Sequence, residues 1–233
     1  MGTLCIIPAR GGSKRIPHKN IKDFLGKPII AYSIAAARES GLFDEVMVST
    51  DDEEIAEVAR AYGAEVPFLR SERASSDKAT TLEALAEVID WYRERGSRPE
   101  LVCCIYPTAP FVTPDLLGKA YHLLTAQDFD CVFPVLRYGF PVQRSVTLDG
   151  DRRMRLRYPE HRATRSQDLE PTYHDAGMFY WFKTGPVLSA GTLWTSNTGC
   201  TVLSELAAQD IDTVEDWNLA EFKYQYNFRR AQT

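Results

Sequence analysis

The sequence lacks any apolar run long enough to cross a membrane, and its first five residues carry neither a basic start nor a long apolar stretch. We therefore expect no secretory signal, no membrane anchor and a cytoplasmic location. An excess of positive charge is also missing, because the net charge is −5. A nucleic-acid partner needs a broad basic face, so any bound nucleotide is expected to be a small molecule.

Cysteine is scarce and has no pattern that suggests a metal site or a disulfide framework. The odd number of five, at spacings that match no zinc motif, argues against both, and four of the five lie inside apolar runs. No polar tract is long enough to predict disorder, and the composition, 44% hydrophobic and 25% charged, is that of an ordinary globular protein. We expect a single domain over residues 1–233.

The most informative stretch runs from Ile6 to Asn20, where a short apolar run is followed by glycines, a hydroxyl and cations. Gly11 and Gly12 allow the backbone to approach a ligand closely, and Ser13 adds a hydroxyl donor. The cations are Arg10, Lys14, Arg15 and Lys19. The spacing is neither that of a Walker loop nor that of the dinucleotide motif G-x-G-x-x-G. It predicts a phosphate-binding loop after a buried strand, rather than a turn with a solvated basic surface.

The rest of the first half alternates between β-prone runs and amphipathic helical patterns. Strands are expected at Leu4–Ala9, Glu45–Ser49, Glu65–Leu69 and Leu101–Tyr106, with helices from Pro28 to Ser40, after an Asp51–Glu54 capping pair, from Thr80 to about Arg95 and after Thr113. Such alternation predicts an α/β fold, a Rossmann-like and mostly parallel sheet with helices on both faces. Ligands of these sheets lie beyond the carboxyl ends of the strands. The loop at Arg10, the Thr50–Asp51 turn, the Arg70 segment and the Tyr106–Thr108 turn are therefore expected along one crevice.

The alternation breaks between about 137 and 175, a segment with eight arginines and no long helical pattern. We expect an excursion from the sheet that acts as a lid or a dimerisation arm. Arg162, Arg165 and Gln167 within it suit a sugar carboxylate, although solvated surface arginines are the usual case. His174 and Asp175 are neighbours in an extended segment and face opposite sides, so a structural His174 is favoured over a catalytic one. A strand at Gly177–Lys183 and a short helix at Pro186–Ala190 follow.

Asp210 and Asp212 flank the apolar Ile211 near the end of the chain, just before a last helix that Thr213 is expected to cap and that should run to about Tyr226. If this segment ends a strand, alternation places both carboxylates on one side. Two carboxylates together with substrate phosphates suit Mg²⁺. D-x-D is a common pattern, so helix capping by one of the acids stays open as the other interpretation.

Several motifs together resemble a known family, the cytidylyltransferases that activate sialic acids and related sugar acids. The stretch from Ile7 to Asn20 resembles the nucleotide-binding signature of that family. The likeness continues in Tyr106–Phe111, Thr164–Leu169, Asp175–Trp181 and Gln209–Thr213, so it spans nearly the whole chain.

The resemblance implies roles for individual residues. It implies that Arg10, Ser13 and Lys19 hold the phosphates of CTP, and that Arg70, Ala79 and Thr81 surround its cytosine and ribose. It implies Mg²⁺ at Asp210 and Asp212, and a sugar-acid contact at Arg165. The resemblance also implies a homodimer in which the excursion of one chain reaches the site of the other.

The reaction that the resemblance implies joins CMP from CTP to a nonulosonic acid and releases pyrophosphate. Neuraminic acid enzymes of the family usually read Q-P-T-S-P-L-R where this chain has Tyr106–Val112, without the glutamine and the final arginine. The difference implies a sugar acid of other stereochemistry, pseudaminic acid first, with Tyr106 among its contacts. Other sugar acids (neuraminic, legionaminic or 3-deoxy-octulosonic) and a nucleotide-binding module without turnover are the alternatives. The paired carboxylates argue against the module.

Overall fold

The computed structural model describes residues 2–231 and centres on one mixed sheet. Its strands are β1 (Thr3–Pro8), β4 (Glu45–Ser49), β5 (Leu101–Ile105), β6 (Cys131–Arg137), β9 (Tyr173–Asp175), β10 (Phe179–Lys183) and β11 (Thr198–Leu203). The order across the sheet is β11-β6-β10-β5-β1-β4, with β9 paired to β6. Strands β4, β1 and β5 are parallel, whereas β10 runs antiparallel between β5 and β6. The expected mostly parallel α/β sheet is confirmed.

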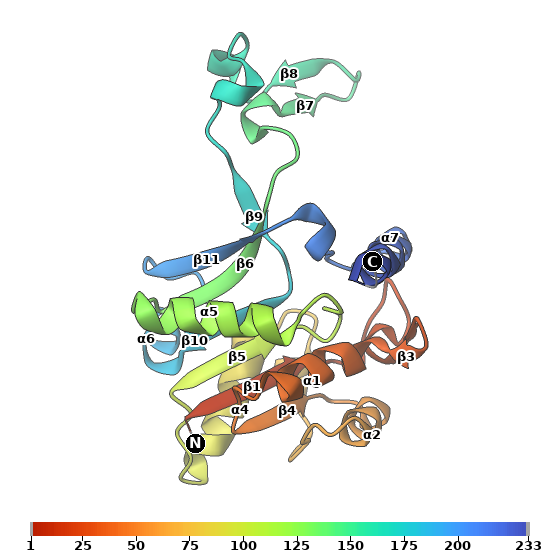
Figure 1. Cartoon of the computed structure of the whole chain (residues 1–233), viewed down its shortest axis with the longest axis vertical. Helices are drawn as coiled ribbons and strands as arrows, with labels where there is room; N and C mark the ends of the chain where they lie inside the picture. The colour runs from red at the N-terminus through yellow and green to blue at the C-terminus, as the bar shows by residue number, and fades with distance from the viewer. Residues whose placement is uncertain (1, 232–233) are drawn as a thin grey trace.

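Helices cover both faces of this sheet (Figure 1). They are α1 (Ile29–Ser40), α2 (Glu53–Ala61), α3 (Glu72–Ser75), α4 (Thr81–Glu94), α5 (Pro114–Ala126), α6 (Thr184–Ala190) and α7 (Val214–Ala231). Side chains of β1 alternate between the faces. Cys5 and Ile7 belong to the core under α1 and α5, and Leu4 and Ile6 to the core under α4. A strand buried on both sides explains the continuous apolar run in the sequence.

Helix starts follow the capping chemistry of the sequence closely. Thr80 caps α4 in a complete capping box with Glu83, and Thr113 caps α5 with Pro114 as the first helical residue. Asp51 was wrongly expected to cap α2. The N-cap is Asp52, whose Oδ1 accepts from the amides of Glu54 (2.9 Å) and Ile55 (3.2 Å).

The bounds of several other elements differ from those expected. Residues 65–69 form only an isolated bridge between Glu65 and Met47, because Pro67 has no amide hydrogen for a ladder. Pro28 pairs in β3 (Lys27–Pro28) with β2 (Asp23–Phe24), and α1 begins one residue later. The segment around Ile211 is not a strand, and α7 continues to Ala231.

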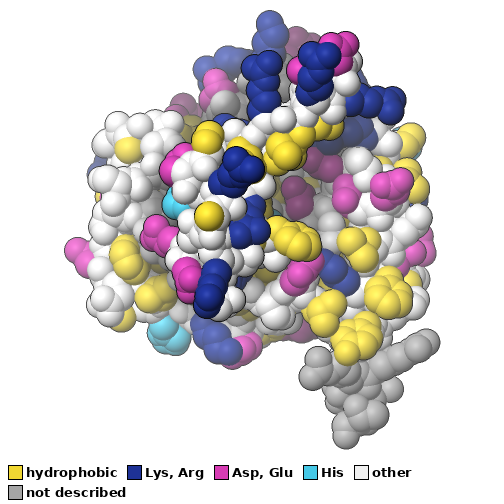
Figure 2. All heavy atoms as spheres, turned by 90° about the horizontal axis from the view of Figure 1, so that it is seen from above, with side chains coloured by type: hydrophobic (Ala, Val, Ile, Leu, Met, Phe, Trp, Pro, Cys, Tyr) yellow, Lys and Arg dark blue, Asp and Glu magenta, His cyan; other side chains and the backbone are white. Residues whose placement is uncertain are grey.

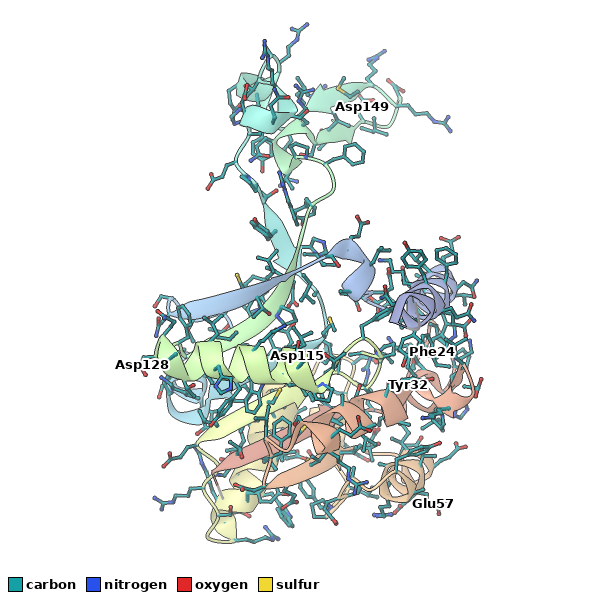
Figure 3. All side chains as sticks on the ribbon, in the orientation of Figure 1. Phe24, Tyr32, Glu57, Asp115, Asp128 and Asp149 are labelled. Carbon is teal, nitrogen blue, oxygen red and sulfur yellow. The ribbon has the colours of Figure 1, made fainter. Side chains whose placement is uncertain are left out.

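The segment between β6 and β9 projects from the sheet as an arm (Figure 1). It holds the hairpin β7 (Val146–Leu148) and β8 (Met154–Leu156), which pair antiparallel, and Asp149 lies at its turn (Figure 3). We define the arm as residues 138–172. That residues 1–233 form a single domain remains a prediction.

An aromatic cluster fixes α7 against the N-terminal part of the chain. Phe24 lies edge-on to Tyr32, Trp217 and Tyr224, with ring centroids 5.5 to 5.7 Å apart. Figure 3 shows Phe24 and Tyr32 beside this helix. Such aromatic pairs stabilise a fold by more than the burial of their surface area alone.

Within residues 2–231, the structure has no helix whose length and hydropathy suit a membrane span.

Candidate active site

The carboxyl ends of β1 and β5 open onto a cavity of about 620 Å³. Its lining comes from three distant parts of the sequence: Pro8, Arg10, Ser13, Lys14, Arg15, Lys19 and Asn20; Thr81 and Tyr106–Thr108; and Asp210 with Asp212. The crevice expected from strand order therefore exists. Thr50 and Asp51 do not line it, and Asp51 instead accepts a hydrogen bond from the loop that follows β1.

Backbone and side-chain hydrogen bonds hold this loop in shape. The Gly11 amide donates to Asp51 Oδ1 (2.9 Å), and Asn20 Nδ2 donates to the Arg10 carbonyl (2.9 Å). A Cβ on Gly11 would lie 2.5 Å from Asp52 Oδ2, so only glycine fits there. The glycine is thus required by the contact with the α2 cap, whereas Gly12 borders open space. Binding of phosphate by either glycine stays a prediction.

The four cations of the loop are already paired with acids. Asp77 accepts from Arg10 Nη1 (2.9 Å) and from Lys14 Nζ. Asp212 Oδ1 lies 2.8 Å from Arg15 Nη2 and 3.5 Å from Lys19 Nζ. The hydrogen bond from Lys14 is the largest cause that lowers the pKa of Asp77. These side chains are mostly exposed, and exposed ion pairs are weak, so a polyphosphate can replace the carboxylates as the partner of the cations.

Asp210 and Asp212 enter the cavity from either side of Ile211, which is fully buried. The alternation expected for a strand end is preserved without a strand, because Ile211 packs into the core and Lys19 Nζ binds its carbonyl (2.7 Å). Desolvation by the surrounding protein, followed by the charge of Asp212, raises the pKa of Asp210. Two acids that repel each other in one wall make a site for positive charge.

An adjoining cavity of about 260 Å³ contains the other expected nucleotide residues, Arg70, Ala79 and Thr81. It shares Arg10, Thr81 and Tyr106 with the first cavity. The Arg70 guanidinium is buried and donates to Ser49 Oγ (3.0 Å) and to the Ser49 carbonyl. Burial lowers the pKa of Arg70. Its side chain therefore holds the end of β4 as well as bordering the cavity.

The arm residues do not reach these two cavities in the single chain. Arg165 is exposed, and Gln167 borders a separate cavity of about 610 Å³ at the base of the arm, next to Tyr138. His174 is also outside the site, where its ring packs on Tyr138 with centroids 4.8 Å apart. Viewed from the arm tip, Lys and Arg side chains gather along one edge of the molecule (Figure 2).

Sequence reasoning did not predict the contacts that three acids make in or near the site. Asp51 holds the Gly11 amide, Asp77 pairs with two loop cations, and Asp175 accepts a hydrogen bond from Tyr180. Asp77 lies in a polar loop whose composition gave no sign of its partners. The signal for Asp51 was available, because an acid directly after a strand lies at the edge where the β1 loop is expected.

The raised pKa of Asp210 predicts a pH dependence of stability without metal or nucleotide. An acid with a raised folded-state pKa destabilises the fold as the pH rises from its unfolded pKa through its folded pKa. We expect Asp210→Asn to have a higher free energy of unfolding than wild type at pH 7 and to lose that advantage at low pH. Urea unfolding across a pH series measures this.

The matched control is Asp128→Asn, for which the expected change in the free energy of unfolding at pH 7 has the opposite sign. A hydrogen bond from Lys183 is the largest cause that lowers the pKa of Asp128, so its stabilisation is present at neutral pH and lost as the pH falls. Asparagine tolerates the positive φ of 57° at that position. An Asp210→Asn protein that is less stable than wild type at pH 7 would contradict the assigned repulsion.

The chain is similar in sequence to known cytidylyltransferases. A family model described as cytidylyltransferase matches residues 4–188. The chain is 41% identical to a pseudaminic acid cytidylyltransferase of Campylobacter jejuni subsp. jejuni, covering 99% of this chain and 100% of the relative. It is 33% identical to a CMP-N,N'-diacetyllegionaminic acid synthase of Legionella pneumophila, covering 95% of each.

Solved structures show the same fold. A CMP:2-keto-3-deoxy-manno-octonic acid synthetase complexed with CTP superposes with a TM-score of 0.69 at 16% identity, over 97% of this chain and 100% of that one. A 4-diphosphocytidyl-2C-methyl-D-erythritol synthase from Anaerococcus prevotii has a TM-score of 0.63 at 15% identity, over 96% and 98%. The matched family model and the end-to-end relatives show that this chain belongs to the cytidylyltransferase family.

Proposed function

We propose that the protein transfers CMP from CTP to pseudaminic acid and releases pyrophosphate. The observation that carries the proposal is the single cavity in which the cations of the β1 loop face the carboxylates of Asp210 and Asp212. The end-to-end similarity to a pseudaminic acid cytidylyltransferase supports the choice of sugar acid. Because the reaction consumes CTP, we place it in the cytoplasm.

In this reaction the anomeric hydroxyl oxygen of the sugar acid bonds to the α-phosphorus, the bond to the pyrophosphate oxygen breaks, and the hydroxyl proton passes to water. Arg10, Ser13 and Lys19 surround the triphosphate and stabilise the charge on its oxygens. Ala79 and Thr81 border the adjoining cavity, which we assign to the nucleoside, and Tyr106 lines both cavities. The residues mainly align the nucleophile with the leaving group, which is the larger part of phosphoryl-transfer catalysis.

The two aspartates fit a magnesium ion. Within residues 2–231 there is no group of three or more Asp, Glu, His or Cys side chains that would form an all-protein metal site. Magnesium is commonly held by one or two carboxylates together with substrate phosphates, which is what this wall offers. Bound there, it would neutralise phosphate charge and lower the repulsion between Asp210 and Asp212.

The function is tested by incubating the protein with CTP, Mg²⁺ and one sugar acid at a time while pyrophosphate is measured. We expect the highest kcat/KM with pseudaminic acid, and lower values with legionaminic, neuraminic and 3-deoxy-octulosonic acids. A preference for another acid would change the substrate, whereas tight CTP binding without pyrophosphate from any acid would indicate a binding module.

Arg10→Ala serves as the site variant of this assay, and Lys119→Ala, an exposed cation on α5, as its control. Loss of a preorganised phosphate contact is expected to lower kcat/KM by roughly 10²-fold. Equal activity of both variants would remove the loop from the proposed mechanism.

The metal assignment predicts that Asp212→Asn weakens Mg²⁺ binding. Calorimetric titration of Mg²⁺ into the CTP complex should give a dissociation constant at least several-fold higher than wild type, because one of two carboxylate ligands is lost. Asp115→Asn, which removes an exposed acid on α5, is the matched control. An unchanged titration in Asp212→Asn would place the ion elsewhere.

We further propose a homodimer in which the arm of one chain carries Arg165 and Gln167 to the cavity of the other. The arm exposes large apolar side chains, with Phe140 89%, Leu148 66% and Met154 59% exposed. Such a surface on an extended hairpin is typical of a subunit interface. It also explains why two expected sugar contacts lie outside the cavities of their own chain.

Mixing two inactive variants tests this arrangement. Arg10→Ala damages the cavity and Arg165→Ala damages the arm, so a mixed dimer contains one intact composite site. We expect recovery of about one quarter of wild-type activity after subunit exchange, and a dimer mass by sedimentation. No recovery from an exchanged mixture, or a monomer in solution, would contradict the arrangement.

A further inference from the structure

The segment that carries Asp210 and Asp212 has little backbone structure of its own. It links β11 to α7 (Figure 1), and apart from one short 3₁₀ turn over Glu205–Ala207, residues 204–213 form no helix or strand. Peptide groups that have left a sheet need other hydrogen-bond partners where water is excluded. The placement of the two carboxylates therefore depends on what holds these peptides.

Side chains on one face of α7 supply such partners. Asp216, in the first turn of the helix, accepts through Oδ2 from the amides of Asp212 (3.1 Å) and Thr213 (2.8 Å). Lys223 follows seven residues later, a spacing of two helical turns that returns to the same face. It holds the part of the segment before Ile211, so the helix contacts the segment on both sides of that residue.

Lys223 is a buried lysine whose three donors are all used. Its Nζ donates to the carbonyls of Glu205 (2.9 Å) and Ala208 (3.1 Å) and to Gln209 Oε1 (2.9 Å). An ammonium group has three N–H bonds, so these contacts satisfy it completely. The side chain is 8% exposed, and burial lowers the pKa of Lys223. All three acceptors are uncharged groups of one segment, so the contacts fix the geometry of that segment.

Gln209 carries this contact to Asp210. Its Oε1 faces Lys223, and its Nε2 donates to the Asp210 carbonyl (2.9 Å). The ammonium can only donate and the carbonyl can only accept, so both ends of the amide have a fixed assignment. The main chain on both sides of Gln209 is therefore tied to Lys223, directly at the Ala208 carbonyl and through the amide at the Asp210 carbonyl.

The carboxyl group of Asp210 has little room to compensate for a shift of this main chain. A Cβ on Gly177, which has a φ of +63°, would lie only 3.1 Å from Asp210 Cγ. The carboxyl group therefore packs directly against the Gly177 backbone and cannot move closer to it. Its place in the cavity wall follows the main chain of residues 208–210.

We propose that Lys223, acting through Gln209 and the peptides before it, positions the Asp210 carboxylate beside Asp212 for a divalent cation held together with the substrate phosphates. Lys223 and Gln209 do not line the cavity, so both are positioning residues. The proposal deepens the function given above and rests on its metal assignment. A lysine that only stabilised the fold would change the melting temperature and leave the affinity for the cation unchanged.

The experiment is a calorimetric titration of Mg²⁺ into the CTP complex of Lys223→Met, in which an apolar side chain replaces the ammonium. We expect the dissociation constant for Mg²⁺ to rise about 10-fold, the usual order of effect for residues that orient a metal ligand. CTP binding in EDTA is expected to change by less than about threefold, because the proposed phosphate contacts of the β1 loop do not require the ion. Unchanged Mg²⁺ binding, or an equal loss of CTP affinity in EDTA, would overturn the proposal.

Gln209→Leu tests the link to Asp210 while the charge of Lys223 is kept. Gln209 is half-buried, and its replacement leaves two of the three acceptors of Lys223 in place, so this variant decides the question if Lys223→Met does not fold. We expect the dissociation constant for Mg²⁺ to rise by at least about threefold. Wild-type Mg²⁺ binding in Gln209→Leu would overturn the proposal, because Lys223 would then not act through Gln209.

Thr184→Val is the matched control for loss of stability. The buried Thr184 hydroxyl also donates to a backbone carbonyl, that of Pro99 (3.0 Å), which lies before β5, whereas the cavity lies at the carboxyl end of β5. The variant is expected to lower the melting temperature and to leave the dissociation constant for Mg²⁺ unchanged. A rise equal to that in Lys223→Met would assign the effect to stability and overturn the proposal.

The titrations use CTP and Mg²⁺ without a sugar acid, which separates this inference from the proposed function. If wild type releases no pyrophosphate with any acid but Lys223→Met still weakens Mg²⁺ binding, the function fails and the inference holds. Normal turnover with unchanged titrations would give the reverse result. A wild-type CTP complex that binds no Mg²⁺ would overturn the inference, while pyrophosphate release would still decide the function.

Discussion

The Lys19 ammonium joins the two parts of the chain that make the site. It donates to the Ile211 carbonyl (2.7 Å) and lies 3.5 Å from Asp212, a partner 193 positions away in the sequence. Its side chain is 19% exposed, so this is the most enclosed of the loop's ion pairs. Together with the ion pair between Arg15 and Asp212, this contact holds the basic loop beside the two carboxylates. Packing of Phe24 against Trp217 and Tyr224 supports the same junction from the core side.

The junction places each cation of the loop next to an acidic side chain. Asp77 and Asp212 neutralise the loop cations when no anion is bound, which keeps four positive side chains together without strong repulsion. Exposed pairs of this kind exchange partners at low cost. Asp210 differs, because the surrounding protein and the charge of Asp212 disfavour its ionised form. Under the proposed function, a cation and a polyphosphate that bind together would supply both the partner that Asp210 and Asp212 lack and the anion that the loop cations bind.

The sequence predicted those features that depend on interactions between near neighbours in the chain. The capping box at Thr80 and Glu83, the Thr113–Pro114 start and the alternation around Ile211 all depend on neighbours within a few residues. Expectations failed where a neighbouring residue competed for the same role. Asp52 caps α2, which leaves Asp51 to hold the Gly11 amide, and Pro67 prevents a strand that its apolar neighbours favoured.

By itself, the sequence determined the α/β class, the glycine and cation content of the loop at residues 6–20, and the position of Asp210 and Asp212 on either side of a buried Ile211. These depend on periodicity, on glycine and cation content and on a two-residue spacing, which are local properties. Only the tertiary structure decided that the loop and the acids share one cavity, that Asp77 pairs with the loop and that Asp175 accepts a hydrogen bond from Tyr180. The reason is that long-range contacts follow from the order of strands in the sheet, and side-chain patterns within a segment carry no information about which distant segment will lie beside it.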